Sequence, residues 1–481
     1  IVDTGFYDEQ ISIPPIIGTS ATNTITFTTT VKDSTKTIIH YNSLSSYDNY
    51  ILQLVGADYI RFEYFNFQCS NVVSDMRCIY ITNGSHHNIF RNNKIGFQNS
   101  NTLNISGIYS TSQLNNYNKI VNNYVENCRN GIILNGADKG NLIKDNVITG
   151  FSSSGIYVNN QDSIIVDANI ISGHGYYGIN FNSCINGSKL INNRIILYSG
   201  SSSILGIYAR YNSGTASERI LIANNFISSF SGNSISGMYV LNNNYINIFH
   251  NSINLLSSGG NSNYAIRFRS SSSGKYGNIN FKNNIVLNKG IGYAIIVEDD
   301  TASMSHLNNS DYNIFYTNGP SFGVYGTTSI NDINHWQKIT SKDKNSFTAL
   351  PLFINDSDLH LLSPRKYRIN NPLPAVTTDI DGEIRSKVKP IVGADDLHVY
   401  ALDAAALQLT NPLSTTCEGP SEFYAKIINE ASEPMDSVEI EWSVNGNIHQ
   451  PIKYFGRIRS FEEVTVYLGI DSLNATLKNE A

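Results

Sequence analysis

This sequence is poor in charged residues, which make up 15% of its 481 positions. The formal net charge of −6 leaves no broad basic surface, so nucleic acid and anionic membranes are poor candidate partners. The sequence contains no run of about 18 apolar residues, and a membrane-inserted segment is therefore not expected. Apolar residues make up 41%, which excludes general disorder, and the length exceeds what one compact core holds.

Cysteine is scarce, and its spacing excludes the common zinc sites. The five copies are Cys69, Cys78, Cys128, Cys184 and Cys417. None forms a CxxC pair or a Cys/His cluster, so no metal site is expected. Cys69 and Cys78 are close enough in sequence to form a disulfide in an oxidising compartment, while Cys128 and Cys184 are expected to be buried and inert. The chain starts at Ile1 without a signal peptide, which suggests a piece of a longer protein.

What the sequence does contain is a repeat. A Gly-Ile pair or a close variant recurs every 23 to 31 residues. The pairs are Gly107-Ile108, Gly131-Ile132, Gly155-Ile156, Gly178-Ile179, Gly206-Ile207, Gly237-Met238, Ala265-Ile266 and Ala294-Ile295. Each repeat is too short to bury its own apolar face, so the units are expected to stack as coils of an extended β-structure.

A second element, apolar-x-x-Asn-x-apolar, lies between successive Gly-Ile pairs. Its asparagines are Asn93, Asn123, Asn146, Asn169, Asn193, Asn225, Asn251 and Asn284. At a sharp corner each amide can donate to and accept from the equivalent amide about 4.8 Å away, so a ladder along the corner is predicted. A structural role is favoured over a catalytic one, because a catalytic residue is not needed on every coil.

The corner asparagines and Gly-Ile strands resemble the pectate-lyase-like superfamily of right-handed parallel β-helices, over residues 50–320. The flanks resemble large β-helix surface proteins of Bacteroidetes-type bacteria, in the opening segment GFYDEQISIPPIIGTSATNTITF and the closing segments NHWQKITSKDKNSFTALPLFINDSDLHLLSP and TDIDGEIRSKVKPIVGADDL. From about Tyr400, the segment CEGPSEFYAKIINEASEPMDSVEIEWSVNGN resembles an immunoglobulin-like accessory domain with Trp442 in its core.

The resemblance implies an all-β chain with a right-handed parallel β-helix over residues 1–400 and an immunoglobulin-like β-sandwich over residues 401–481. About seven strands are usual in such a sandwich, so this one is expected to be truncated, and Cys417 to lack a partner. The resemblance also implies type IX secretion and a secreted or cell-surface location. We expect a monomer within a larger multidomain chain.

The hydrolase motifs of this fold are incomplete. Polygalacturonase-type enzymes need paired carboxylates. Only Gly173-His174-Gly175 matches one of their motifs, and Asp299-Asp300 follows that histidine instead of preceding it. No lyase motif is recognised either, so the catalytic residues are unknown.

Cofactor binding has equally little support. No cofactor is predicted, although calcium stays open because lyases use a cation to neutralise a uronate carboxylate. Asp379, Asp381 and Glu383 are interpreted as an acidic turn that closes the helix, in preference to a cation loop.

Strand alternation predicts which side chains share the outer face beside the Gly-Ile column. If the isoleucines point inward, the residues one and three positions later point outward. The residues so placed on consecutive coils are Tyr208, Arg210, Tyr239, Arg267, Arg269 and Glu298. Aromatic rings and guanidinium groups suit an acidic sugar chain. The alternative is that the tyrosines only stack between coils and that Arg269 and Glu298 form a cross-coil ion pair.

The leading hypothesis is a glycan-binding or adhesin-like structural surface protein whose partner is a polysaccharide or cell-surface glycan. The alternative is a polysaccharide lyase, or less favourably a glycoside hydrolase, acting on an acidic polysaccharide. A third interpretation is a spacer that holds other domains away from the cell.

Overall fold

The computed structural model describes residues 1–42, 49–70, 75–97, 105–111, 114–198, 203–230, 234–256, 263–270, 276–299, 307–396, 402–412, 418–431 and 433–473. The chain forms two compact units. The first contains Ile1–Ile369, Thr378–Gly382 and Ile391–Asp396, and the second contains Asn370–Thr377, Glu383–Pro390 and Leu397–Ala481. The predicted domain boundary at residue 400 falls outside the described residues, as does Cys417.

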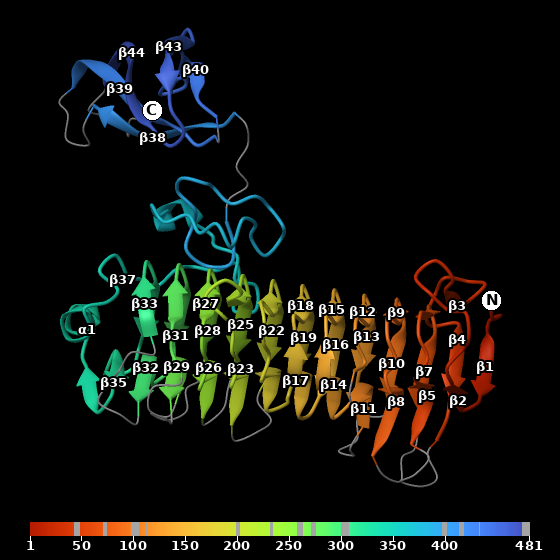
Figure 1. Ribbon diagram of the computed structural model, residues 1–481. Helices are drawn as coiled ribbons and strands as arrows, with labels where there is room; N and C mark the ends of the chain where they lie inside the picture. The colour runs from red at the N-terminus through yellow and green to blue at the C-terminus, as the bar shows by residue number, and fades with distance from the viewer. Residues whose placement is uncertain are drawn as a thin grey trace. The chain divides into compact units, whose positions relative to one another are not determined.

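The first unit is the predicted right-handed parallel β-helix, whose coils pass through three sheets of 13, 13 and 11 strands (Figure 1). Sheet 1 contains β1 (Gly5–Asp8), β4 (Thr37–His40), β7 (Asn66–Cys69), β10 (Lys94–Phe97), β13 (Tyr124–Glu126), β16 (Val147–Phe151), β19 (Ile170–Gly173), β22 (Arg194–Leu197), β25 (Phe226–Ser229), β28 (Ser252–Leu255), β31 (Ile285–Asn288), β34 (Ile314–Thr317) and β37 (Phe347–Thr348).

Sheet 2 contains β2 (Ile11–Ile13), β5 (Tyr50–Val55), β8 (Met76–Thr82), β11 (Ile105–Thr111), β14 (Asn130–Lys139), β17 (Ser154–Asp162), β20 (Tyr177–Asn182), β23 (Ile204–Arg210), β26 (Ile235–Leu241), β29 (Tyr264–Ser270), β32 (Tyr293–Asp299), β35 (Gly323–Tyr325) and β36 (Thr328–Ile330). Only the last pair of this sheet, β35 with β36, is antiparallel.

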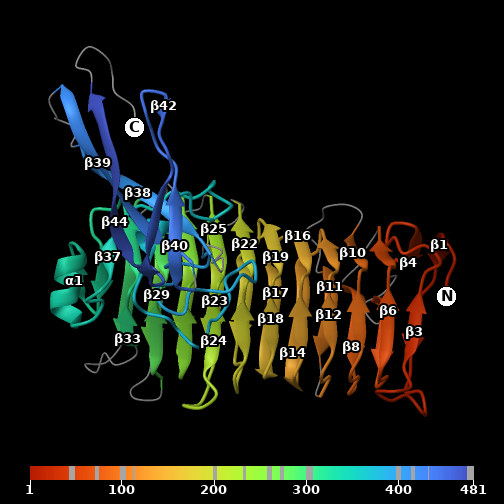
Figure 2. The same cartoon turned by 90° about the horizontal axis from the view of Figure 1, so that it is seen from above.

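Sheet 3 contains β3 (Ile25–Thr28), β6 (Ile60–Glu63), β9 (Ile89–Arg91), β12 (Lys119–Val121), β15 (Leu142–Lys144), β18 (Ile165–Asp167), β21 (Lys189–Ile191), β24 (Ile220–Ala223), β27 (Ile246–Phe249), β30 (Ile279–Lys282) and β33 (Leu307–Asp311). Along the chain a coil runs from sheet 3 to sheet 1 and then to sheet 2, and Figure 2 shows the strands of the first unit following one another along the solenoid.

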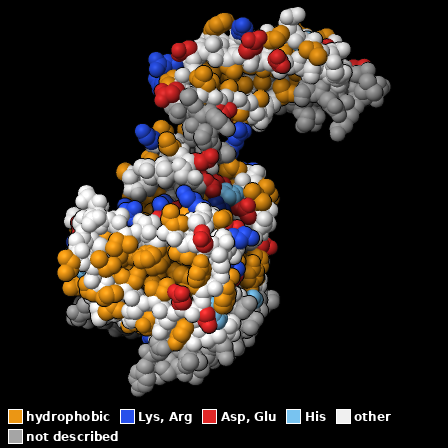
Figure 3. Space-filling view, turned by 90° about the vertical axis from the view of Figure 1, so that its right-hand side faces the viewer, with side chains coloured by type: hydrophobic (Ala, Val, Ile, Leu, Met, Phe, Trp, Pro, Cys, Tyr) orange, Lys and Arg blue, Asp and Glu red, His pale blue; other side chains and the backbone are white. Residues whose placement is uncertain are grey.

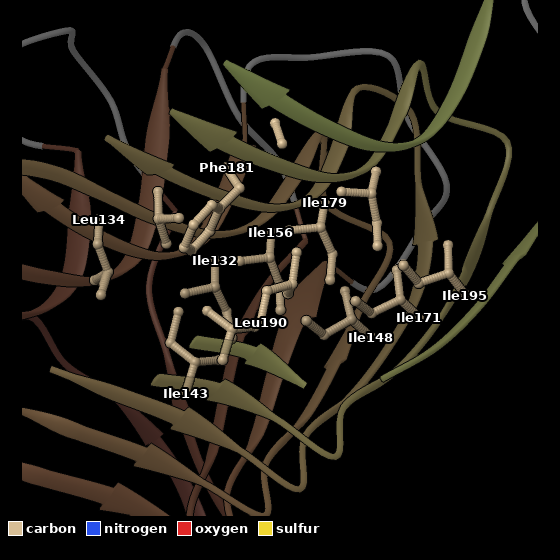
Figure 4. Packing of buried hydrophobic residues seen from close by; sticks show 14 of the residues in the cluster. Ile132, Leu134, Ile143, Ile148, Ile156, Ile171, Ile179, Phe181, Leu190 and Ile195 are labelled. Atoms are coloured by element: carbon tan, nitrogen blue, oxygen red, sulfur yellow. The ribbon is translucent and has the colours of Figure 1, made fainter. Parts of the chain in front are cut away.

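The interior is filled by columns of identical or similar apolar side chains. Ile108, Ile132 and Ile156 are opposite one another in register, and each is fully buried. Columns from sheets 1 and 3 face them, so that isoleucines of all three sheets meet in the core (Figure 4). Burying one such side chain stabilises the fold by roughly 1.5–3 kcal/mol, and the solenoid repeats this on every coil.

The glycine of each Gly-Ile pair is required by close approach at the corner between sheets 1 and 2. A Cβ atom on Gly178 would lie 2.4 Å from Ile195 Cγ2 and 2.6 Å from the carbonyl oxygen of Gly206 on the next coil. Gly131 has the same environment, 2.5 Å from Gly155 O. The repeat therefore contains glycine for reasons of space.

The corner between sheets 3 and 1 carries the asparagine ladder. Asn169 is fully buried, and its Nδ2 donates to Asn193 Oδ1 at 2.9 Å, while its Oδ1 accepts from the backbone N–H of Asn146 at 3.0 Å. The same pair of bonds links every neighbour from Asn93 to Asn284 and continues to Asn313.

The residue before each ladder asparagine has a left-handed backbone, which turns the chain sharply. These residues are Asn92, Asn122, Asp145, Ala168, Asn192, Asn224, His250, Asn283 and Tyr312, with φ between 53° and 60°. Asparagine adopts this conformation more readily than other non-glycine residues. The corner is thus a two-residue turn whose second residue supplies the ladder amide.

The two ends of the solenoid differ. After the last coil, α1 (Ile333–Thr340) buries Trp336, whose indole N–H donates to Asp343 Oδ2 at 2.9 Å. Asp343 Oδ1 also accepts from Asn313 at 3.0 Å and so closes the ladder, and a 3-10 helix follows at Pro364–Tyr367. At the other end, Figure 3 shows hydrophobic side chains gathered on the surface. Ile1, Phe6 and Ile17 in the N-terminal part of the chain are exposed.

The second unit consists of small antiparallel sheets. The largest contains β38 (Ala404–Asn411), β39 (Gly419–Asn429) and β44 (Glu463–Leu473), and two further pairs are formed by β40 (Met435–Ile440) with β43 (Ile452–Ile458) and by β41 (Ser443–Val444) with β42 (Asn447–Ile448). Trp442 is half-buried and packs against the core of this unit, stacked on His449 with ring centroids 3.8 Å apart. The immunoglobulin-like assignment stays a prediction.

Cys69 and Cys78, which are close enough in sequence to form a disulfide, are both free and buried. Cys69 is the last residue of β7 and Cys78 is the third residue of β8, in a different sheet, and the Cys78 thiol contacts the carbonyl oxygen of Gly96 at 3.8 Å. Cys128 and Cys184 are also free and buried.

Candidate functional site

The outer face of sheet 2 carries the columns that the strand alternation predicts. Tyr208 is paired in register with Tyr239, and Tyr239 with Arg267. A second column, three positions after each isoleucine, is also paired in register from coil to coil. It consists of Arg210, Leu241, Arg269 and Glu298. Consecutive strands lie about 4.8 Å apart, so the six predicted side chains share one strip across four coils. We call this strip the Tyr-Arg face.

Aromatic rings form a continuous stack along the Tyr-Arg face. The rings of Tyr177 and Tyr208 lie 5.7 Å apart at an interplanar angle of 11°, and those of Tyr208 and Tyr239 lie 5.2 Å apart at 20°. The Arg267 guanidinium continues the stack 4.8 Å from the Tyr239 ring centroid and 5.1 Å from that of Tyr264. The stack therefore holds the Arg267 guanidinium beside two aromatic rings.

The acidic residue of the face, Glu298, does not form the ion pair with Arg269 that the alternative interpretation of this face gave it. Arg269 and Glu298 are opposite one another in register, but the ion pair is formed by Arg267, whose Nη2 lies 2.5 Å from Glu298 Oε2. Burial alone would lower the pKa of Arg267, but the bond to Glu298 raises it above its ordinary value. The stack on Tyr239 orients the Arg267 side chain toward the diagonal neighbour, which leaves Arg269 exposed and without an ion-pair partner among the described residues.

Arg210 brings to this face a second cation without an ion-pair partner among the described residues. Its guanidinium lies 5.2 Å from the Tyr208 ring centroid, and its Nε is buried without a hydrogen-bond partner in the described part of the chain. Asn180 Oδ1, in the same column as Tyr208, is also buried and unsatisfied there. Burial raises the pKa of the Tyr208 phenol, so this ring is neutral at physiological pH.

Sequence reasoning missed part of the face. Tyr177, Tyr264 and Tyr293 occupy a further outward column, two positions before the buried isoleucine. At the other end of sheet 2, the Arg77 guanidinium lies 4.8 Å from the ring centroids of both Tyr80 and Tyr109. Strict alternation would not have found the first group, because a position two before the isoleucine has the same parity as the isoleucine and is predicted to point inward.

The Gly-His-Gly match has a packing explanation. A Cβ atom on Gly173 or Gly175 would lie 2.7 Å or 2.6 Å from the Phe151 ring, which fits between the two glycines. The ring of His174 lies 5.6 Å from that of Tyr198. The Asp299-Asp300 pair lies outside the residues whose side chains are described.

A separate cluster of titratable groups lies in the closing segment of the first unit. One oxygen or nitrogen atom from each of His360, Asp381 and Asp395 lies within 4.8 Å of the others. His360 Nε2 is 2.7 Å from Asp381 Oδ2, and its Nδ1 contacts Asp358 Oδ1. Arg194 Nη2 lies 2.6 Å from Asp381 Oδ1.

The protonation of this cluster argues for an ion-pair network. Burial alone would lower the pKa of His360, but the bonds to Asp381 and Asp358 raise it above its ordinary value. Burial raises the pKa of Asp395 to about 6. Both imidazole nitrogens of His360 are directed at carboxylates, which is the arrangement of an ion-pair network.

In the acidic turn, the Asp379 carboxylate accepts hydrogen bonds from backbone N–H groups. Asp379 is buried, and its two oxygens accept from the backbone N–H groups of Asp381 at 3.0 Å and Asp396 at 3.1 Å.

Among the described residues, no helix is long and apolar enough to cross a membrane.

No protein-family model and no curated protein matches the chain. Solved structures do match. A periplasmic alginate epimerase has 14% identity over 65% of this chain and 77% of its own, with a TM-score of 0.41. The A-module of a mannuronan C-5 epimerase from Azotobacter vinelandii has 13% identity over 72% and 90%, with a TM-score of 0.35, and a pectate lyase has 13% over 82% and 88%, with a TM-score of 0.36. What this chain shares with them is the right-handed parallel β-helix.

Proposed function

We propose that the Tyr-Arg face binds an acidic polysaccharide and that the chain is a secreted or cell-surface carbohydrate-binding protein. The observation that carries this proposal is the stack of Tyr177, Tyr208, Tyr239 and Arg267, flanked by the guanidinium groups of Arg210 and Arg269, neither of which has an ion-pair partner among the described residues.

The chemistry of the face fits an extended anionic sugar chain. Aromatic side chains present apolar surface to the sugar rings, and guanidinium groups bind carboxylates through two parallel hydrogen bonds. Three arginines stand against one glutamate on the strip, so its charge favours an acidic ligand. The rise per coil of about 4.8 Å lets successive sugars meet equivalent side chains.

Buried polar atoms add a second reason. Arg210 Nε and Asn180 Oδ1 have no partner among the described residues. An unsatisfied buried donor or acceptor costs about 1–3 kcal/mol, which a bound hydroxyl or carboxylate would offset after a small shift of the side chains.

A lyase acting on an acidic polysaccharide is the second candidate, and the pairing of Arg210 with the neutral phenol of Tyr208 favours it. In such a reaction a base removes the proton beside the uronate carboxylate, an arginine neutralises that carboxylate, and the bond to the leaving sugar breaks as the double bond forms, while an acid such as the neutral Tyr208 phenol gives a proton to the leaving oxygen. A glycoside hydrolase is less favoured, because the face shows one carboxylate where the reaction needs two.

Binding and turnover are measured together with polygalacturonate, alginate and a glycosaminoglycan, and with a neutral glucan as the reference polymer. We expect an acidic polymer to bind, and Arg210→Ala combined with Arg269→Ala to weaken binding at least tenfold. Arg91→Ala is the matched control, because Arg91 lies on sheet 3 and pairs with Glu63. Binding unchanged by the double variant would overturn the proposal, and an unsaturated product that absorbs in the ultraviolet would establish the lyase.

A further inference from the structure

A polar groove of about 660 Å³ lies at the corner between sheets 3 and 1, near the N-terminal end of the solenoid. Its lining includes the side chains of Lys32, Asp33, Tyr64, Asn92, Asn122 and Tyr124. None of them belongs to the Tyr-Arg face, which lies on sheet 2.

The lengths of four successive turns explain why a groove forms here. Two residues connect the sheet 3 strand to the sheet 1 strand in the coils that turn at Tyr64, Asn92 and Asn122, and each of these three has a left-handed backbone. In the first coil the same connection, residues 29–36, is eight residues long. This longer connection supplies Lys32 and Asp33, which line the groove together with the short turns.

The amides of the groove have hydrogen-bonding capacity left over. Asn122 Nδ2 donates to Asn92 Oδ1 at 2.5 Å. In the side-chain amides, this leaves the Nδ2 N–H groups of Asn92 and the Oδ1 atom of Asn122 without a partner among the residues that the structure describes. One donor and one acceptor therefore face the groove side by side.

The same corner on later coils lacks this spare capacity. Asn192 Nδ2 donates to Asp167 Oδ1 at 2.7 Å, and Asn224 Nδ2 donates to Asn192 Oδ1 at 3.1 Å and to the carbonyl oxygen of Thr378 at 2.7 Å. At these later corners, Asp167 and Thr378 accept hydrogen bonds from the side-chain amides. In the groove, the described residues supply no such acceptor to Asn92 Nδ2.

Charge and aromatic surface complete the set. Asp33 Oδ1 accepts from Thr35 N at 2.8 Å and from Thr35 Oγ1 at 2.7 Å, and these bonds lower the pKa of Asp33. Asp33 is therefore a carboxylate at neutral pH. Its second oxygen, Oδ2, has no hydrogen-bond partner among the described residues. Lys32 has no ion-pair partner among them. Tyr124 is 40% exposed, and its ring lies 5.8 Å from Lys94 Nζ.

We propose that this groove is a second carbohydrate site, which binds a neutral pyranose unit. Neighbouring hydroxyls of a pyranose each donate and accept, which matches the adjacent free amide donor and acceptor and the free Asp33 oxygen. The two tyrosines offer ring surface to the apolar face of the sugar. Lys32 and Asp33 together carry no net charge, and Asp33 repels an acidic sugar. The volume lies within the range of sites for small ligands.

The test uses the whole chain and the methyl glycosides of glucose, galactose, mannose and N-acetylglucosamine, with saturation-transfer NMR as the readout. We expect at least one of them to bind. Tyr124→Ala is expected to weaken that binding about three- to tenfold through loss of the ring contact. Asn122→Gly, which keeps the left-handed turn but removes the amide, is expected to weaken it to a similar extent.

Matched controls separate this site from the Tyr-Arg face. Asn192→Gly makes the same change in the same turn outside the groove, and Tyr198→Ala removes a tyrosine with the same exposed fraction, 40%. Neither these nor Arg269→Ala should alter the binding of the methyl glycoside. If no glycoside binds, or if binding survives both Tyr124→Ala and Asn122→Gly, the second site does not exist, whatever is found for acidic polymers on the other face.

Discussion

Arg267 binds the carboxylate of Glu298, its diagonal neighbour on the next coil, while its guanidinium lies 4.8 Å from the ring centroid of Tyr239 on the preceding coil. The one acidic side chain of the Tyr-Arg face thus neutralises the arginine at the end of the aromatic stack. An acidic ligand must either compete with Glu298 for Arg267 or bind Arg210 and Arg269.

This competition gives the first prediction. Glu298→Gln removes the internal counter-charge but leaves an amide oxygen for Arg267 to hold, so the stack should stay in place. We expect affinity for an acidic polysaccharide to rise about two- to fivefold, and to fall with added salt more steeply than in the unaltered protein. A calorimetric titration at two salt concentrations measures both effects. Reduced affinity would mean that Glu298 contacts the ligand itself.

The ladder gives a prediction about stability. Asn169→Ala leaves the backbone N–H of Asn146 and the carbonyl oxygen of Ile143 without their partners inside the corner. Because each buried unsatisfied group costs about 1–3 kcal/mol, we expect the free energy of unfolding to fall by about 3–5 kcal/mol in urea denaturation. Asn159→Ala is the control. It removes an amide from the outer face of sheet 2, where Asn159 Nδ2 donates to Asn135 Oδ1, and should cost under about 1 kcal/mol.

The glycine corner gives a third prediction. Gly178→Ala places a methyl group 2.4 Å from Ile195 and 2.6 Å from the Gly206 carbonyl oxygen, so the coils must separate locally. We expect a loss of about 1–3 kcal/mol, measured by urea denaturation. Ala265→Gly, at the equivalent position of a coil that already accepts a methyl group, should cost no more than about 1 kcal/mol. Equal losses in the two variants would contradict the steric explanation.

Much of the solenoid could be predicted from sequence because its signals repeat. The Gly-Ile pairs and corner asparagines recur on each coil, and strand alternation then fixes which side chains face outward, as the pairing of Tyr239 with Arg267 shows. The partner of Glu298 could not be predicted, because register places Arg269 opposite it and only the stack on Tyr239 directs Arg267 there.

The groove was equally invisible in the sequence. Lys32 and Asp33 lie in a non-repeating connection, and nothing in the pattern brings that connection beside Asn92 and Asn122 two and three coils later. The left-handed residues before the ladder asparagines were also missed, since tyrosine, alanine and histidine occupy that position as well as asparagine. The ladder bonds hold these less suited residues in the turn.

The closing segment predicts a pH dependence of stability. The folded-state pKa of Asp395 is about 6 against 3.8 for the free group, and that of His360 is raised above 6.5. Both groups therefore bind protons more tightly in the folded state, so their contribution to stability is present at low pH and is lost as pH rises. For Asp395 the loss runs from about pH 4 to pH 6 and amounts to about 1–3 kcal/mol, and for His360 it lies above pH 6.5.

Asp395→Asn, whose amide oxygen can still accept from Leu361 N, should abolish the lower step and leave the upper one, and His360→Gln should do the reverse. The free energy of unfolding of each variant, measured in urea at intervals from pH 4 to pH 8, resolves the two steps. A wild-type stability that rises relative to Asp395→Asn between pH 4 and pH 6 would show that the carboxyl is ionised when folded.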